Sequence, residues 1–245
     1  MAVFQFGAGS LWGINTSSGT NTPQQFGTVQ EVSIEASFNT KELYGSKQFP
    51  VAIARGTGKV TGKAKFAQIN GDIYNQLFFG ANSVSGQVLT ANNEAGTVGS
   101  SPYTVTVTNS ATFATDLGVC YTLTGLPLIK VASAPTTGQY SVSAGVYTFA
   151  SADTGLGVSI SYTYTAASTG KKITITNQAL GTTPFFQIYF TTTYNGKQVN
   201  VQLPQCTSSK LSLISTKMED FGVPEFDFAA LADASGNVLI LSTAE

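Results

Sequence analysis

Alternation of apolar and polar side chains is the feature that most limits how this chain can fold. Within Val29–Thr40, apolar residues occupy every second position, and small or acidic residues lie between them. A period of two places the two sets on opposite faces of an extended strand. The pattern returns at Lys59–Phe66, where lysine and threonine alternate with small or apolar residues. The sequence therefore predicts a mostly β protein with half-buried strands.

One segment has a helical pattern instead. Its apolar residues recur at helical spacing along one stripe, which predicts a helix that packs against a sheet. Gly71 costs about 1 kcal/mol relative to alanine inside a helix, so the helix is expected to begin at Asp72 as N-cap and to end at Gly80. The stripe consists of Phe66, Ile69, Ile73, Tyr74, Leu77 and Phe78.

Turn residues divide the rest of the chain into short apolar runs. Gly56–Gly58 predicts a turn, and Asn195–Gly196 is a strong hairpin signal. The strands expected in the middle of the chain are Tyr103–Thr108, Val119–Leu123, Gln139–Val142, Val146–Phe149 and Val158–Thr165. Those expected after it are Lys172–Thr176, Phe185–Tyr194, Gln198–Leu203, Cys206–Ile214, Pro224–Ala230 and Val238–Leu241.

These runs suggest three parts. Residues 1–28 form an N-terminal arm that docks on this or a neighbouring subunit, or alternatively supply a strand of the chain's own fold. Residues 29–81 and 170–245 together form a core domain. Residues 82–169, which carry few charges, form a β-rich elaboration of the core or an inserted small β domain.

Composition excludes several function classes. Charged residues make up 10% of the chain, against about 25% in typical soluble domains, so much of the surface is expected to be covered by other copies. The alternative is a β protein kept soluble by its many hydroxyl groups. A net charge of −1 and a single arginine, Arg55, argue against reading of nucleic-acid bases. No apolar run approaches the ~20 residues of a membrane helix, and the N-terminus does not resemble a signal peptide.

Catalysis, metal binding and cofactors are not expected. The chain has no histidine, which removes histidine bases and imidazole ligands. Glu31 and Glu35 would lie about 13 Å apart on a strand, too far for a glycosidase pair. Cys120 and Cys206 are expected to be buried free thiols, although one disulfide is possible.

Two blocks resemble a known family. The segment Glu42–Gly80, ELYGSKQFPVAIARGTGKVTGKAKFAQINGDIYNQLFFG, resembles the core segment of tail tube (major tail) proteins of long-tailed bacteriophages. The segment Lys217–Ala234, KMEDFGVPEFDFAALADA, resembles the C-terminal signature of that family. Together with Val29–Thr40, these blocks cover under half of the chain.

The resemblance implies a fold and a role. The subunit would be a β-sandwich or split barrel with one flanking helix, and six copies would join their sheets into a ring barrel. Stacked hexameric rings would form the tail tube, the conduit for DNA during ejection. Its partners would be other copies and the tape measure, tail terminator and baseplate proteins, and DNA would pass through the lumen without specific binding. The protein would be made in the cytoplasm of the host bacterium and be located in the virion tail, with no enzymatic activity.

The family role suggests which residues contact DNA and neighbouring rings. A channel that conducts DNA should not bind phosphates, so the polar face of the first strand is expected to line it. That face consists of Glu31, Ser33, Glu35 and Ser37. The loop Lys41–Gly58 and the arm are candidates for ring-to-ring contacts, through Lys41, Tyr44, Phe49 and Arg55.

Charge is unevenly distributed along the chain. Lys41–Lys65 holds half of the basic residues and a single acid, whereas Lys217–Asp233 is acidic. One interpretation is pairing between subunits. The alternatives are pairing within one chain and simple solvated faces. The candidates are Lys59, Lys63, Lys65, Glu219, Asp220, Glu225 and Asp227.

Two other functions remain open at this stage. One is another virion structural protein, of the decoration or baseplate type. The second is a carbohydrate-binding β-sandwich, which predicts a signal peptide and an exposed aromatic platform. The single tryptophan, Trp12, lies in the expected arm.

Overall fold

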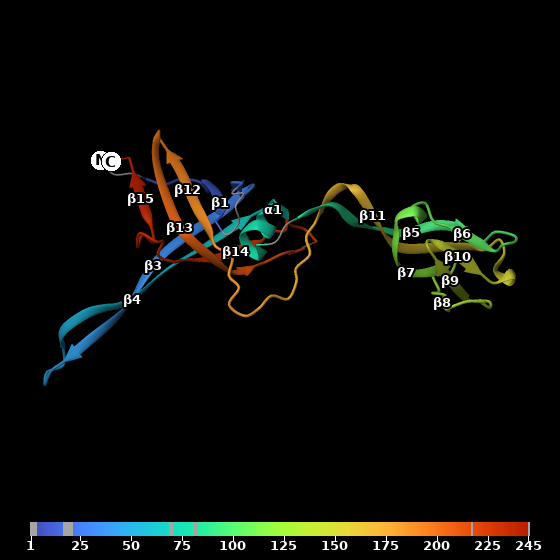
Figure 1. Cartoon of the computed structure of the whole chain (residues 1–245), viewed down its shortest axis with the longest axis horizontal. Helices are drawn as coiled ribbons and strands as arrows, with labels where there is room; N and C mark the ends of the chain where they lie inside the picture. The colour runs from blue at the N-terminus through green and yellow to red at the C-terminus, as the bar shows by residue number, and fades with distance from the viewer. Residues whose placement is uncertain (1–3, 17–21, 69–70, 81–82, 217, 245) are drawn as a thin grey trace. The chain divides into compact units, whose positions relative to one another are not determined.

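The computed structural model describes residues 4–16, 22–68, 71–80, 83–216 and 218–244. Strands make up most of the chain, which confirms the mostly β prediction. The chain divides into two compact units (Figure 1). Unit 1 comprises Met1–Ser83 and Ile173–Glu245, and unit 2 comprises Val84–Lys172. No helix among the described residues is long and apolar enough to cross a membrane.

Unit 1 is built on an eight-stranded antiparallel sheet. The strand order is β2-β1-β12-β13-β14-β4-β3, and β15 also pairs with β13. The strands are β1 (Ser10–Asn15), β2 (Gln24–Gln25), β3 (Val29–Tyr44), β4 (Pro50–Phe66), β12 (Phe186–Tyr194), β13 (Lys197–Leu211), β14 (Glu225–Ala230) and β15 (Ile240–Thr243). The expected arm thus contributes two strands to the sheet.

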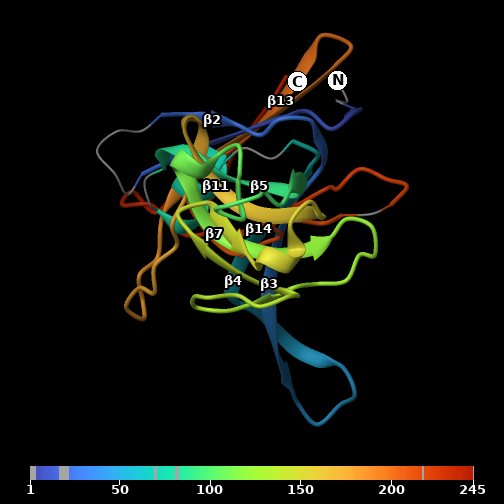
Figure 2. The same ribbon diagram turned by 90° about the vertical axis from the view of Figure 1, so that its right-hand side faces the viewer.

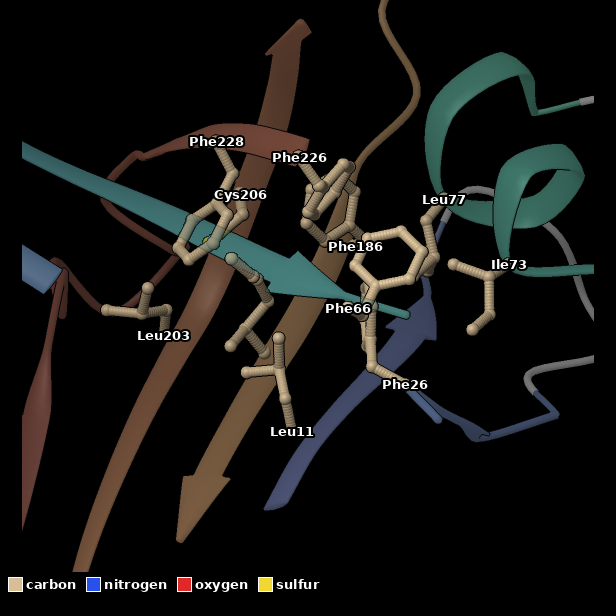
Figure 3. Packing of buried hydrophobic residues seen from close by; sticks show 12 residues of the cluster. Leu11, Phe26, Phe66, Ile73, Leu77, Phe186, Leu203, Cys206, Phe226 and Phe228 are labelled. Atoms are coloured by element: carbon tan, nitrogen blue, oxygen red, sulfur yellow. The ribbon is translucent and has the colours of Figure 1, made fainter. Parts of the chain in front are cut away.

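The long strand β13 changes neighbours along its length. Its first half pairs with β15 and its second half with β14, so the sheet has two halves. The core packs between them: the Phe26 ring contacts those of Phe66 and Phe226, with centroids 5.3 and 5.5 Å apart. Figure 3 shows these side chains pointing toward one another, Phe66 from β4, Phe226 from β14 and Phe26 from the residue that follows β2. This arrangement is consistent with a β-sandwich, and the described strands form no closed barrel.

A short helical segment covers one end of this core. It consists of α1 (Gly71–Ile73) and π-helical turns η1 (Tyr74–Phe79), and it buries Ile73 and Leu77. A Cβ on Gly13 would lie 2.3 Å from a methyl carbon of Leu77, so glycine in β1 permits this close contact. The predicted start at Asp72 is wrong, because Gly71 is already helical and costs little outside a helix interior. Ile69 of the predicted stripe lies outside the described residues.

Strands β3 and β4 form one long hairpin. The turn predicted at Gly56–Gly58 is wrong, because β4 continues through it with a shift in register opposite Phe38 and Thr40. A Cβ on Gly58 would lie 2.8 Å from the Phe38 ring. Glycine at this position therefore makes room for an aromatic ring on the neighbouring strand. The predicted turn at Asn195–Gly196 does form, with φ values of 49° and 73°.

Unit 2 contains two sheets, with orders β6-β10-β9-β8 and β5-β11-β7. Its elements are β5 (Val84–Thr97), β6 (Thr104–Thr106), η2 (Ser110–Thr112), β7 (Phe113–Tyr121), β8 (Ile129–Lys130), β9 (Gln139–Ser143), β10 (Val146–Phe149), η3 (Ser151–Asp153) and β11 (Gly157–Lys172). The sequence did not predict β5. The predicted strand Lys172–Thr176 is also wrong, because β11 ends at Lys172 and the next strand begins at Phe186.

Candidate functional site

The outer part of the β3–β4 hairpin is a candidate contact surface. This part, residues 38–55, is called the distal hairpin, and it extends away from the other strands of unit 1 (Figure 1, Figure 2). Six of its large apolar side chains are each more than half exposed. They are Phe38, Leu43, Tyr44, Phe49, Val51 and Ile53. Because a free monomer rarely exposes so many apolar groups together, this surface is suited to a partner.

Strand pairing brings three of these six side chains to one face. Ile53 lies directly opposite Glu42, and directly opposed residues of an antiparallel pair share a face. Alternation along β3 adds Phe38 and Tyr44 to this face. Val51 is not assigned to it, because a shift in register just before Tyr44 leaves Val51 without a partner on β3. Phe38, Tyr44 and Ile53 therefore share one face of the distal hairpin, called its apolar face.

Two contacts hold polar groups on that apolar face. The Arg55 guanidinium lies 4.7 Å from the centroid of the Phe38 ring, a cation–π contact. The Tyr44 hydroxyl donates a hydrogen bond to the Glu42 carboxylate, which raises the pKa of Tyr44. Both contacts orient side chains that point into solvent in the single chain.

The predicted ring-to-ring residues do not all lie together. Tyr44 and Arg55 share the apolar face, whereas Lys41 lies opposite Ala54 on the other face. Phe49 immediately precedes β4 and is 80% exposed, which leaves it free to reach a neighbour. The sequence did not single out Val51 or Ile53, because the register shifts between β3 and β4 are not visible in the alternation.

The predicted channel-lining residues lie on the outer face of β3, away from the core. Strand pairing places each of them opposite a residue of β4. The pairs are Glu31 with Lys65, Ser33 with Lys63, Glu35 with Thr61, and Ser37 with Lys59. Strand β14 extends these rows, because Glu225 lies opposite Lys65 and Asp227 opposite Lys63. The outer face is therefore a ladder of acidic, basic and hydroxyl groups.

Two lysines of this ladder have acidic partners in their own chain. Lys65 Nζ lies 2.6 Å from Glu31 Oε2, and its hydrogen bond and charge lower the pKa of Glu31. Lys63 forms an ion pair with Glu225. For these residues the structure shows the pairing within one chain that the sequence left open as an alternative.

The remaining charge candidates have different surroundings. Asp227 is half-buried, and its Oδ1 has no hydrogen-bond partner among the described residues. Lys59 is exposed, and its backbone carbonyl accepts a hydrogen bond from the Ser37 hydroxyl at 3.4 Å. Glu219 and Asp220 are exposed in the segment between β13 and β14, where Asp220 Oδ1 accepts from the Phe221 N–H at 2.8 Å.

The described residues contain no group of three or more His, Cys, Asp or Glu side chains that could hold a metal ion. Cys120 and Cys206 are both free thiols. Burial raises the pKa of Cys206 to about 12, so its thiolate is scarce at neutral pH. No family model and no curated protein matches the chain.

Proposed function

We propose that this protein is the building block of a bacteriophage tail tube. Copies join edge to edge into hexameric rings, and the rings stack into a hollow conduit for DNA. The observation that carries the proposal is the distal hairpin, which exposes six large apolar side chains in the single chain. Burial of such a surface is favourable by roughly 25 cal/mol per Å² of apolar area, so contact between copies is favoured. The resemblance of Glu42–Gly80 to tail tube proteins supports the same assignment.

The margins of the sheet support assembly from copies. Strand β3 is 16 residues long and ends the strand order, so one of its edges is unpaired within the described chain. At the other margin, β1 is covered only by the two residues of β2. Unpaired edges of this length tend to aggregate unless they are covered. Joining one margin to the other margin of the next copy is a heterologous contact, which forms a ring when the rotation between copies closes.

The ladder on the outer face of β3 and β4 supports passage of DNA. In the proposed ring this face lines the lumen. Glu31 and Glu35 repel phosphates there, and Lys63 and Lys65 are occupied by acids of their own chain. Few cations then remain for the counterion-releasing contacts that hold DNA in place.

Negative-stain electron microscopy of the purified protein tests this proposal. We expect the unmodified chain to form hollow tubes of stacked rings at high concentration. Replacing Val51 and Ile53 by serine removes two exposed apolar side chains from the distal hairpin. We expect this double variant to stay folded, with a Tm close to that of the parent, and to form no tubes.

A matched variant separates the hairpin from general surface effects. Leu123→Ser with Leu126→Ser also removes two exposed apolar side chains, but from unit 2, and should leave tubes intact. Full-length tubes from the hairpin variant would contradict the proposed role of the distal hairpin. An unmodified chain that stays monomeric at high concentration, or forms only isolated rings, would contradict the tube and favour a decoration or baseplate component.

A further inference from the structure

A second surface lies on the other half of unit 1, on the outer face of β1, β12, β13 and β15. Strand pairing builds a row across it, with Trp12 opposite Tyr189, Tyr189 opposite Gln202, and Gln202 opposite Ile240. Gln25 of β2 lies opposite Trp12 on the other side. Directly opposed residues share a face, so an aromatic pair lies among amide side chains.

Hydrogen bonds fix the orientation of these amides. The Tyr189 hydroxyl donates to Gln187 Oε1 at 3.1 Å and accepts from Gln202 Nε2 at 3.2 Å. The Thr191 hydroxyl donates to Asn200 Oδ1. In each of these amides, either the oxygen or the nitrogen therefore forms a hydrogen bond within the protein. The opposite ends, Gln187 Nε2, Gln202 Oε1 and Asn200 Nδ2, have no partner among the described residues and are available to a ligand.

The surface is hollowed and uncharged. Trp12, Tyr189, Asn200, Gln202 and Ser242 line a hollow of about 290 Å³, at the lower end of the roughly 300–1,000 Å³ typical of small-molecule sites. Trp12 is 39% exposed, so part of its ring is accessible from this hollow. None of the lining residues carries a charge, which favours a neutral ligand over a phosphate or a carboxylate.

We propose that this surface, the aromatic–amide site, binds a pyranose ring of a neutral oligosaccharide. Such a ring has an apolar C–H face, which packs on the aromatic pair, and a rim of hydroxyls, which exchange hydrogen bonds with oriented amides. The proposal goes beyond a role in assembly. The distal hairpin and the free edge of β3 do not contribute to the site, and the β1–β2 margin supplies it with side chains of the outer face rather than with the backbone edge that the proposed ring pairs. The site also faces away from the outer face of β3, since the core lies between the two halves.

The single tryptophan makes the test specific to this site. Trp12 is the only tryptophan in the chain, so its fluorescence reports on the hollow alone. The full chain is titrated separately with maltotetraose, cellotetraose and tri-N-acetylchitotriose, with sorbitol as an open-chain polyol control. We expect a saturable change with at least one oligosaccharide, half-complete at roughly millimolar concentration, and none with sorbitol.

Two variants at the site and one elsewhere show whether the amides take part. Gln202→Leu and Asn200→Ala should each raise the half-saturating concentration about fivefold, the effect of one lost hydrogen bond. Gln30→Leu, on β3, serves as the matched control and should bind as the parent does. Either site variant is sufficient, so misfolding of one leaves the test intact.

Four outcomes would overturn the proposal. The first is no saturable change with any of the three oligosaccharides. The second is an equal response to sorbitol, which would indicate a solvent effect. The third is binding that both site variants leave unchanged. A fluorescence change that depends on protein concentration but not on sugar would also overturn it, because it would assign the hollow to contacts between copies.

Discussion

The two units use carboxylates in opposite ways. In unit 2 the acids Glu94, Asp116 and Asp153 each accept a hydrogen bond from a tyrosine hydroxyl. In unit 1, Glu31 and Glu225 pair with lysines on an outer face. The difference indicates that unit 2 uses its few carboxylates to hold its interior together, whereas unit 1 pairs its charges with one another on an outer face.

Asp116 is the clearest case in unit 2. It lies on β7, and its side chain is only 5% exposed. Its partners come from the opposite sheet: the hydroxyls of Tyr140 and Tyr147, at 2.9 Å each, and Lys130 Nζ, at 3.0 Å. Burial together with these hydrogen bonds raises the pKa of both tyrosines. One carboxylate thus joins the two sheets.

The largest effect is expected from Asp116→Ala. The change leaves two buried hydroxyls and one ammonium group without their acceptor, which should cost about 3 kcal/mol of unfolding free energy in unit 2. Six of the ten tyrosines lie in unit 2, so urea unfolding followed by near-ultraviolet tyrosine dichroism reports mainly on unit 2, while Trp12 fluorescence follows unit 1. Asp220→Ala, at an exposed carboxylate, is the control and should change little. A loss of unfolding free energy below about 1 kcal/mol, or an equal loss in unit 1, would contradict the proposed difference between the two units.

A smaller effect is expected from acid. Burial raises the pKa of Asp116 and Glu94, but their hydrogen bonds outweigh it, so both pKa values lie below the ordinary 3.8 and 4.5. The stabilisation they provide is therefore present above those ordinary values and is lost as the pH falls through the lowered ones. The tyrosine-monitored Tm of unit 2 should fall as the pH drops below the ordinary values of 4.5 and 3.8, and Asp116→Asn should flatten that profile. A profile identical in parent and variant would contradict the role of Asp116.

The smallest effect is expected from Lys65→Met in unit 1. Lys65 and Glu31 are 39% and 55% exposed, and exposed ion pairs contribute little because water and salt screen them. Thermal unfolding should show no resolvable change, with or without added salt. Lys63→Met is the informative neighbour. Its partner Glu225 is only 23% exposed, so loss of Lys63 should lower the Tm of unit 1 more than loss of Lys65 does. A drop comparable to that of Asp116→Ala would mean that unit 1 also depends on its charges.

The sequence correctly predicted the strands and turns whose own residues show a clear alternation or turn pattern. Alternation located β3, and Asn195–Gly196 located the turn between β12 and β13. Strand β5 was missed because its Gly, Asn and Ser residues are typical of loops, and it is held in place by pairing with β11. At Gly56–Gly58 a turn signal was wrong because the space was needed by Phe38.

The candidate sites were harder to predict than the strands, because their residues are brought together by strand pairing and not by a local sequence pattern. Alternation placed Glu31 and Glu35 on one polar face, but only the register of β3 with β4 assigned a lysine to Glu31. Trp12 and Tyr189 are far apart in sequence, and no local signal brings them together. The same holds for Asp116 and its tyrosines. Contacts across a sheet are set by which strands become neighbours, which single-sequence patterns do not encode.

The chain enters and leaves unit 2 at a single point, because Val84 and Lys172 are direct partners at the start of β5 and the end of β11. A module attached through adjacent ends can be lengthened, exchanged or deleted without altering the spacing of the strands on either side of it. Unit 2 can then change in sequence or length while the strands of unit 1 keep their pairing. Such an attachment makes unit 2 a natural position for grafting a foreign domain.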